Sequence, residues 1–200
     1  ILNDTKDTDQ RLKLINILSH DVQRIERLIT DYSQILKDEV ALSKEKFKKL
    51  DIVPIVLSVV EDYNNIYQVK RGIKIYCIDD GNKSYLINGI ENRIEQIIAN
   101  LLDNAISFSK ENQNIEVKIS KNLNKEVIVN VIDEGQGFKE KDKTKVFKRF
   151  YSNRPDKFGQ HSGLGLNIVN NLVELHKASI TASNRTDKNG ANLEIIFPKP

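Results

Sequence analysis

The sequence predicts an α/β two-layer domain, in which a mixed sheet packs on helices, preceded by one long coiled-coil helix. Two patterns carry this prediction. Apolar residues recur at helical spacing near the amino terminus, and beyond residue 50 short alternating runs take turns with longer runs of helical period. The composition, 39% hydrophobic and 30% charged, is that of a soluble fold with enough apolar residues to build a core.

The leading helix follows a polar, turn-like stretch at residues 1–10. Its apolar residues lie three and four positions apart, and they are Ile15, Leu18, Val22, Ile25, Ile29, Tyr32 and Leu36. A heptad seam of this length indicates a coiled coil or a helical bundle. The stripe must therefore be buried against a partner helix, from this chain or from another.

A change of pattern near residue 50 divides the chain. Pro54 suits the first turn of a second helical stretch, residues 54–67, and the polar segment 43–52 before it is the best boundary. We therefore predict two parts, residues 1–45 and residues 46–200.

The second part is predicted to contain both strands and helices. Apolar positions recur at helical period over 91–107, and a stretch rich in glycine and lysine, 134–162, is long enough to be a functional lid. The other predicted elements are strands at 73–78, 85–90, 114–120 and 125–133, a helix at 164–176, and strands at 179–184 and 191–197.

The composition argues against several classes of protein. A net charge of +3 is too small to indicate a nucleic-acid partner, and the single Cys77 excludes an internal disulfide and a cysteine-based zinc site. No apolar run reaches the about 20 residues that span a bilayer, so we expect no membrane contact by these residues. The chain opens on Ile1 without a methionine, and we expect it to be part of a longer protein.

The predicted helix 91–107 carries the first of four motifs. Asn100 and Asn104 are four residues apart, so their amides share one face, although asparagine is a poor residue for a helix interior. An amide carbonyl is a hard oxygen ligand suited to Mg²⁺. Capping of a neighbouring loop explains the pair equally well.

The second motif, DEGQGF, directly follows a predicted strand. At the end of that strand the Asp133 carboxylate can accept a hydrogen bond from an amino group such as the N6 group of adenine. Gly135 and Gly137 allow the backbone to approach a flat ring closely. An ordinary turn has the same composition.

The third motif places Gly163 and Gly165 at the start of the helix predicted at 164–176. Backbone N–H groups at such a start form an anion site that favours phosphate. The spacing is neither that of a P-loop nor that of the dinucleotide-binding fingerprint.

The fourth motif, VFKRFYSNRP, is aromatic and basic and lies within the long loop. Phe147 and Phe150 can pin this loop onto the body of the domain, while Lys148, Arg149 and Arg154 can reach phosphates. A solvated basic face is the alternative interpretation.

In their order and spacing, the four motifs resemble the N, G1, F and G2 boxes of the GHKL ATPase superfamily. This superfamily, with its Bergerat-type fold, includes histidine kinases, the chaperone Hsp90, type II topoisomerases and the mismatch-repair protein MutL. The F box and the heptad helix ahead of the domain point to sensor histidine kinases. The resemblance covers residues 11–200. It is especially close to sensor kinases of alphaproteobacterial envelope and acid-sensing systems, which share RFY, RP and the FGQ–SGLGL run.

The resemblance implies a site for ATP and Mg²⁺. Asn104 would hold Mg²⁺ with Asn100 beside it, and residues 138–162 would form a lid. Asp133 would read adenine, and Phe108 would pack near the base. The implied nucleotide-binding residues are Asn100, Asn104, Phe108, Asp133, Gly135, Gly137, Arg149, Gly163, Leu164, Gly165 and Leu166.

Two departures from the family pattern matter. Ser107 stands where many members carry a lysine, so a phosphate contact is missing or is supplied by Arg149 or Arg154. The sequence HKA replaces the usual HGG turn at 176–178 and should change only how the helix ends. His176 itself is expected to be a favourable charge at a helix carboxyl terminus.

His20 is the phosphoacceptor candidate that the resemblance brings forward. The family's acceptor is normally followed within a few residues by proline or asparagine, whereas DVQRIERLI follows His20. The acceptor also lies on the first of two hairpin helices, and the run 20–35 resembles the second. We therefore expect residues 1–45 to be the second helix of an incomplete dimerisation hairpin, with the acceptor upstream.

The implied function is that of a sensor histidine kinase, which passes the γ-phosphoryl of Mg-ATP to a histidine of its dimerisation domain. A response regulator's aspartate would receive it next. The parent would be a homodimeric inner-membrane sensor with this portion in the cytoplasm, and this portion alone should not autophosphorylate. The alternative is an ATP-binding module without kinase activity, serving nucleotide-dependent dimerisation or scaffolding. An Hsp90-like or MutL-like ATPase is disfavoured, because only Glu91 and Glu95 offer a carboxylate in the first part of 91–107.

Overall fold

The computed structural model describes residues 46–82, 84–139, 142–149, 151 and 163–200, together with nine positions between 11 and 29. The chain divides into two compact units, and these nine positions belong to the smaller one. All nine are helical. The members of the predicted stripe among them are 53% to 61% exposed, and they are Ile15, Leu18, Val22, Ile25 and Ile29. Tyr32, Leu36 and His20 lie outside the described residues.

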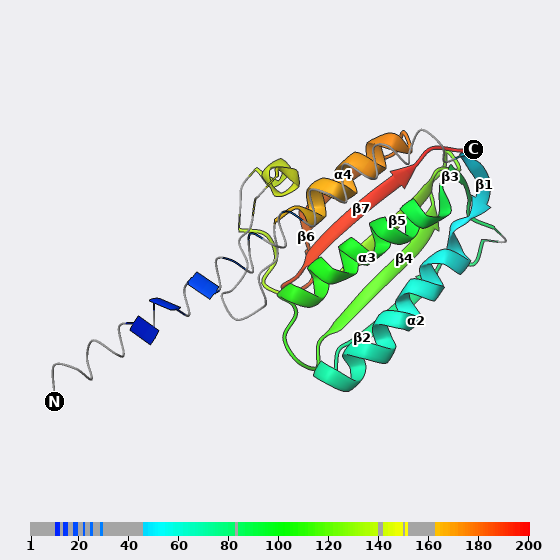
Figure 1. The fold of residues 1–200 in the computed structure, drawn as a ribbon. Helices are drawn as coiled ribbons and strands as arrows, with labels where there is room; N and C mark the ends of the chain where they lie inside the picture. Colours follow the sequence, from blue (N-terminus) through cyan, green and yellow to red (C-terminus); the bar gives the residue numbers. More distant parts are fainter. Residues whose placement is uncertain are drawn as a thin grey trace, which may run out of the picture. The chain divides into compact units, whose positions relative to one another are not determined.

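The larger unit is a five-stranded mixed sheet with helices on one face (Figure 1). Its strands, in the order β2-β4-β5-β7-β6, are β2 (Lys74–Asp79), β4 (Asn114–Lys121), β5 (Val127–Ile132), β7 (Ala191–Phe197) and β6 (Ser179–Asn184). The helices are α2 (Ile52–Arg71), α3 (Glu91–Phe108) and α4 (Gly165–Leu175). Only the β2–β4 pair is parallel among the described strands of this sheet. The predicted two-layer fold is confirmed.

The alternating strands bury every second residue against the helices. In β5 the buried side chains are those of Val127, Val129 and Val131, and in β7 the positions Leu193 and Ile195 are buried in the same way. This is the pattern expected of a sheet that is covered on one face only. The core therefore lies between the sheet and the three helices.

The central helix α3 was predicted almost to its ends. Its six periodic apolar residues are at most 2% exposed, and they are Ile94, Ile97, Ile98, Leu101, Leu102 and Ala105. They pack on the sheet and on the flanking helices α2 and α4. None of the helices within the described ranges combines the length and the apolar character that crossing a bilayer requires.

The segment before α2 contains a strand that the sequence did not predict. Within the stretch interpreted as a polar linker, β1 (Lys48–Asp51) pairs antiparallel with β3 (Leu86–Gly89) as a separate two-stranded sheet. Four residues are too few for an alternating pattern to stand out, and the pairing partner is distant in the chain. Asp51 then caps α2, since its Oδ1 atom accepts from the Val53 N–H at 3.1 Å. Pro54 does lie in the first turn of α2, as predicted.

The predicted loop 134–162 also contains structure. A 3₁₀ helix, η1 (Lys143–Phe147), buries Val146 to 4% exposure, and Phe147 packs against the core as the fourth motif predicts. The start of the lid region is therefore anchored to the domain.

Candidate functional site

The carboxylate of Asp133 lies at the end of β5 and is 3% exposed. Its Oδ1 atom accepts two backbone hydrogen bonds, from Gly135 at 2.8 Å and from Ala191 at 3.1 Å. The Asp133 N–H in turn donates to the Ala191 carbonyl at 3.0 Å. Both side-chain bonds use Oδ1, so the geometry leaves Oδ2 to accept a hydrogen bond from a ligand.

Burial raises the pKa of Asp133 above its ordinary value. The N–H groups of Ala191 and Gly135 and the charge of Arg185 act in the opposite direction but do not cancel the effect of burial. Asp133 therefore takes up its proton at a higher pH than an exposed aspartate does.

Two glycines allow the backbone to close tightly around Asp133. A Cβ atom on Gly190, whose φ is +146°, would lie 2.0 Å from the Asp133 carbonyl oxygen, and one on Gly135 would lie 2.6 Å from the Phe108 carbonyl oxygen. The end of α3, the end of β5 and the start of β7 therefore meet at these glycines. Sequence reasoning missed Gly190, although the turn-like Asn189–Gly190 pair before an alternating strand signals a turn there.

Asn100 lies against the start of α4. Its Oδ1 atom is 3.3 Å from the position that a Cβ on Gly165 would occupy, and its Nδ2 donates to the Gln96 carbonyl at 2.8 Å. Asn104 follows one turn later on α3 and is 7% exposed. The structure thus brings the first and third motifs together.

The amino-terminal turn of α4 carries the predicted anion site. Gly163 has a φ of +72°, and the carbonyl of Leu164 accepts the Ile168 N–H at 2.8 Å to begin the helix. Leu164 is buried and Leu166 packs against the core. The first N–H groups of such a helix have no partner within the helix, so they are available to an anion.

The residue that replaces the family's lysine points into the protein. Ser107 is 4% exposed, and its hydroxyl donates to the Asn104 carbonyl at 2.7 Å. The segment after η1 lies near α4 instead, because Asn167 Nδ2 donates to the Phe147 carbonyl at 2.9 Å. Arg149 follows two residues later and is exposed, and the structure describes no bond between it and the other predicted residues.

The rest of the fourth motif is not described in full. Phe150 and Arg154 lie outside the described residues, as does His161 of the predicted lid. Gly137, in contrast, is described. It has a φ of +72° and lies beside Asn184, whose Oδ1 accepts from the Phe138 N–H at 2.7 Å.

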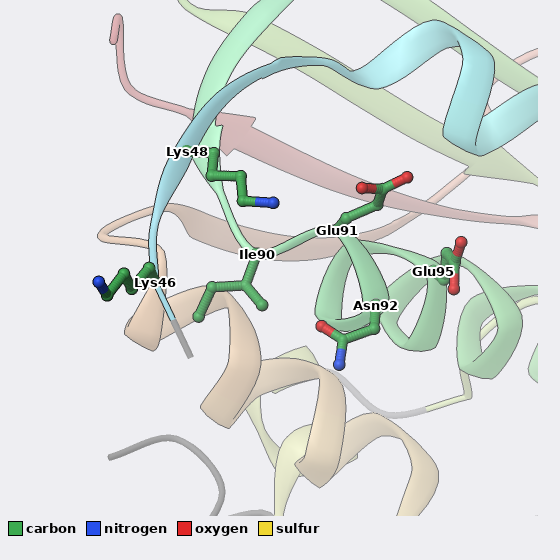
Figure 2. A pocket seen from close by; sticks show the side chains of 6 residues that line it. All are labelled: Lys46, Lys48, Ile90, Glu91, Asn92 and Glu95. Carbon is green, nitrogen blue, oxygen red and sulfur yellow. The ribbon is translucent and has the colours of Figure 1, made fainter. Parts of the chain in front are cut away.

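Two hollows are found on the larger unit. One, of about 430 Å³, borders the turn after β5 and is lined by Lys110, Gln113, Glu134, Gly135, Gln136, Lys188 and Asn189. The other, of about 350 Å³, lies at the start of α3 between two lysines and two glutamates (Figure 2). Only the first shares a residue, Gly135, with the predicted site. The second lies at the opposite end of α3 from Phe108.

Comparison with known proteins supports the interpretation of the motifs. The family model described as Histidine kinase-, DNA gyrase B-, and HSP90-like ATPase matches residues 89–200, more than half of the chain. Sensor protein ChvG of Agrobacterium fabrum is 35% identical over 192 residues, which are 92% of this chain and 32% of that protein. The chain therefore spans about a third of the length of this relative.

Solved structures agree with the fold. The catalytic domain of the histidine kinase ThkA, in a nucleotide-free form, superimposes with a TM-score of 0.67 at 26% identity over 77% of this chain and 96% of that one. ThkA in complex with the response regulator protein TrrA gives a TM-score of 0.67 at 24% identity, over 88% of this chain and 49% of that one. The resemblance to sensor histidine kinases of the ChvG type is confirmed.

Proposed function

Because the chain belongs to the family of histidine kinase-, DNA gyrase B- and HSP90-like ATPases, we propose that it binds Mg-ATP as the catalytic domain of a sensor histidine kinase. One observation carries this proposal: motifs from three separate elements meet around one site. Asn100 of α3 contacts Gly165 of α4, and the end of α3 at Phe108 contacts Gly135 after β5. A site assembled from these positions can hold an adenine at one end and phosphates at the other.

At the adenine end, Asp133 has the chemistry to select an amino-bearing base. Oδ1 is held by two backbone N–H groups, and Oδ2 would accept from the N6 amino group. Buried acceptors of this kind discriminate strongly, since a base without the amino group leaves the carboxylate oxygen unpaired.

The donor set at the centre of the site fits Mg²⁺. The Asn104 amide is buried on the face of α3 that is near the start of α4, and an amide oxygen is a hard ligand. Asn104 would hold the ion, with Asn100 beside it. When bound, Mg²⁺ neutralises part of the phosphate charge.

At the phosphate end, the first N–H groups of α4 would bind the phosphate oxygens. Ser107 faces inward, so Arg149 is the described basic residue that we assign to the contact made by lysine in many relatives. Positioning and electrostatic stabilisation account for most of the catalysis in phosphoryl transfer, and the side chains of this site supply both.

The proposed receiver of the γ-phosphoryl is a histidine outside these 200 residues, in a dimerisation domain that a homodimer would share. His20 stays the less favoured candidate for the reasons given above. A response regulator would be the next receiver, because ThkA is known in complex with one. The parent protein would be anchored in the inner membrane.

Calorimetric titration with Mg-ADP and with Mg-ATP tests the site. We expect Asn104→Ala and Asp133→Ala each to weaken binding at least about tenfold, the effect of removing a good buried interaction. Asn130→Ala is the matched control, because Asn130 pairs with Asn192 and Glu194 on the uncovered face of the sheet. Unchanged affinity in both site variants would refute the assignment.

Incubation with labelled ATP tests the transfer step. We expect no label on the wild-type chain or on His20→Gln, and transfer to a separately supplied acceptor helix. Acid-labile label on the wild type that disappears in His20→Gln would make His20 the acceptor instead.

The second candidate function is that of an ATP-binding module for dimerisation or scaffolding. The exposed stripe on the smaller unit favours it, because side chains such as Leu18 and Ile29 are 58% and 61% exposed. This function predicts nucleotide-dependent association in sedimentation experiments and no transfer to any supplied helix.

A further inference from the structure

His176, at the end of α4, is a buried histidine that the proposed chemistry does not use. It is 3% exposed, and its two ring nitrogens both have backbone partners. Nε2 accepts from the Ile90 N–H at 3.1 Å, and Nδ1 lies 2.7 Å from the Leu172 carbonyl oxygen. A backbone N–H can only donate, so Nε2 is the acceptor and Nδ1 carries the proton.

This geometry corrects the sequence-based expectation for His176. The residue was expected to be a positive charge that stabilises the end of a helix, but the ring is neutral and inaccessible. Burial lowers its pKa, and the bond to the Leu172 carbonyl acts weakly in the opposite direction.

The bond from Ile90 joins the two helices of the nucleotide site. Ile90 is the N-cap of α3, has no side-chain cap, and provides the carbonyl that accepts the first N–H groups of the helix, from Arg93 and Ile94. His176 is the C-cap of α4. The imidazole therefore ties the last turn of α4 to the first turn of α3.

Close packing holds the ring in this position. It makes edge contacts with Phe47 and Phe197, at centroid distances of 5.3 Å and 6.3 Å. A Cβ on Gly89 would lie 3.3 Å from its Cδ2 atom. The ring therefore has little freedom to turn away from Ile90.

The His176 contact and the Asn100–Gly165 contact lie at the two ends of one antiparallel interface. From Ile90 to Asn100 is ten residues, about 15 Å of helix, and from Gly165 to His176 is eleven residues, about 16 Å. The two spans match, and buried apolar side chains of α3 and α4 fill the interface between them. A contact that defines the register at one end therefore constrains the spacing at the other.

We propose that His176 is a positioning residue for nucleotide binding, which holds α4 in register against α3 and thereby places the start of α4 beside Asn100. This inference rests on the proposed function, because the site that it positions is the nucleotide site. The residue touches no substrate and acts through the backbone of Ile90.

Protonation of His176 should break the tie. A proton on Nε2 would face the Ile90 N–H, so two donors would oppose each other in a buried place. Because the folded-state pKa is lowered, this part of the stability is present above the ordinary histidine value of about 6.5 and is lost as the pH falls below it.

Charged groups on the surrounding elements leave this direction unchanged. The elements around the ring bring Lys46 and Lys48 at β1, Glu91, Arg93 and Glu95 on α3, Glu174 and Lys177 at the end of α4, and Lys199 after β7. All are exposed except Arg93, whose guanidinium donates to Gln96 at 3.0 Å. Figure 2 shows those of β1 and two glutamates of α3 around the hollow beside Ile90.

Two conservative variants of the full 200-residue chain separate the two bonds of the ring. His176→Gln can place a neutral acceptor near the Nε2 position, whereas His176→Asn reaches only as far as Nδ1 and leaves the Ile90 N–H without its acceptor. By titration calorimetry with Mg-ADP at pH 7.5, we expect His176→Asn to bind about fivefold to tenfold more weakly and His176→Gln to stay within about twofold of wild type. Equal losses in both variants, or no loss in a folded His176→Asn, would overturn the proposal.

The pH profile adds a readout that a purely structural role would not change. Asp133 titrates in both proteins, so the ratio of wild-type to His176→Gln affinity isolates His176. We expect this ratio to fall as the pH is lowered below the ordinary histidine range. Parallel profiles would contradict the proposed role.

Amide exchange without nucleotide separates this inference from the proposed function. Wild type that fails to bind Mg-ADP would refute the function. Faster exchange at the start of α4 and around Asn100 in His176→Asn than in His176→Gln would still support the positioning role. Identical exchange in the two variants would overturn it.

Discussion

The two ends of the candidate site are built differently. At the adenine end, Asp133, Gly135 and Gly190 are held by backbone contacts, and an added Cβ on either glycine would overlap a carbonyl oxygen. At the phosphate end, the described basic residue Arg149 is exposed, and the segment before it is tied to α4 through Asn167. Backbone contacts tolerate little change, whereas an exposed cation can be moved to another position. This contrast accounts for a chain that keeps the glycines but carries Ser107 in place of a lysine.

The largest effect is expected from Gly190→Ala at the adenine end. The new Cβ would lie 2.0 Å from the Asp133 carbonyl oxygen at a φ that side chains rarely adopt, so the strand start must move. We expect a loss of about 3 kcal/mol of unfolding free energy and of nucleotide binding.

Chemical denaturation with Gly81→Ala as the control checks this prediction. Gly81 also has a positive φ, of +79°, but nothing lies within 4 Å of its added Cβ, so about 1 kcal/mol is expected there. Equal losses in the two variants would show that the contact with Asp133 is unimportant.

Asp133→Asn should separate binding from stability. The amide oxygen can still accept from Gly135 and Ala191, but the amide nitrogen would face the N6 amino group of adenine with a second donor. We expect an affinity for Mg-ADP about 100-fold lower, measured by calorimetry, with the fold retained. A variant that binds as well as wild type would exclude the carboxylate from base recognition.

The pH dependence of stability gives a second readout on Asp133. Its folded-state pKa is raised, so its contribution to unfolding free energy is present below the unfolded-state value of about 3.9 and is lost as the pH rises through the folded-state pKa. The wild type should show this decline in acid-range denaturation curves, and Asp133→Asn should lack it. Superimposable curves would mean that burial does not shift this group.

A smaller effect is expected at the phosphate end. Arg149→Ala should weaken Mg-ATP binding about threefold to tenfold, Mg-ADP binding less and adenosine binding not at all, because the exposed cation contacts only phosphates. The effect should shrink at high salt. Lys118→Ala, on the uncovered face of the sheet, controls for the loss of one positive charge. Equal losses for adenosine and Mg-ATP would place Arg149 elsewhere in the mechanism.

The smallest effect is expected far from both ends, at the turn after α4. Lys177 has a φ of +54°, a conformation that favours glycine, and the family's usual HGG turn has glycine at this position. Lys177→Gly should therefore raise the unfolding free energy by about 0.5–1 kcal/mol, measured by thermal denaturation. Lys125→Gly, at a φ of +64°, should behave alike, and destabilisation in both would argue against strain at these turns.

Periodicity alone was sufficient for the helices and strands of the core. The 3.6-residue pattern of α3 and the two-residue alternation of β5 and β7 are local properties, so a window of a few residues carries the information. The order of the motifs also predicted the meeting of Asn100 with Gly165, because the resemblance supplied the topology that the residues lacked on their own.

Tertiary structure decided the features whose partners are distant in the chain. β1 is a strand because it pairs with β3, Gly190 is required because the Asp133 carbonyl passes beside it, and His176 is neutral because the Ile90 N–H, 86 residues away, points at its ring. Composition and spacing describe what a residue can do, such as carry a charge or accept a proton. Which of these it does depends on burial and on the donors around it, and only the folded chain brings those together.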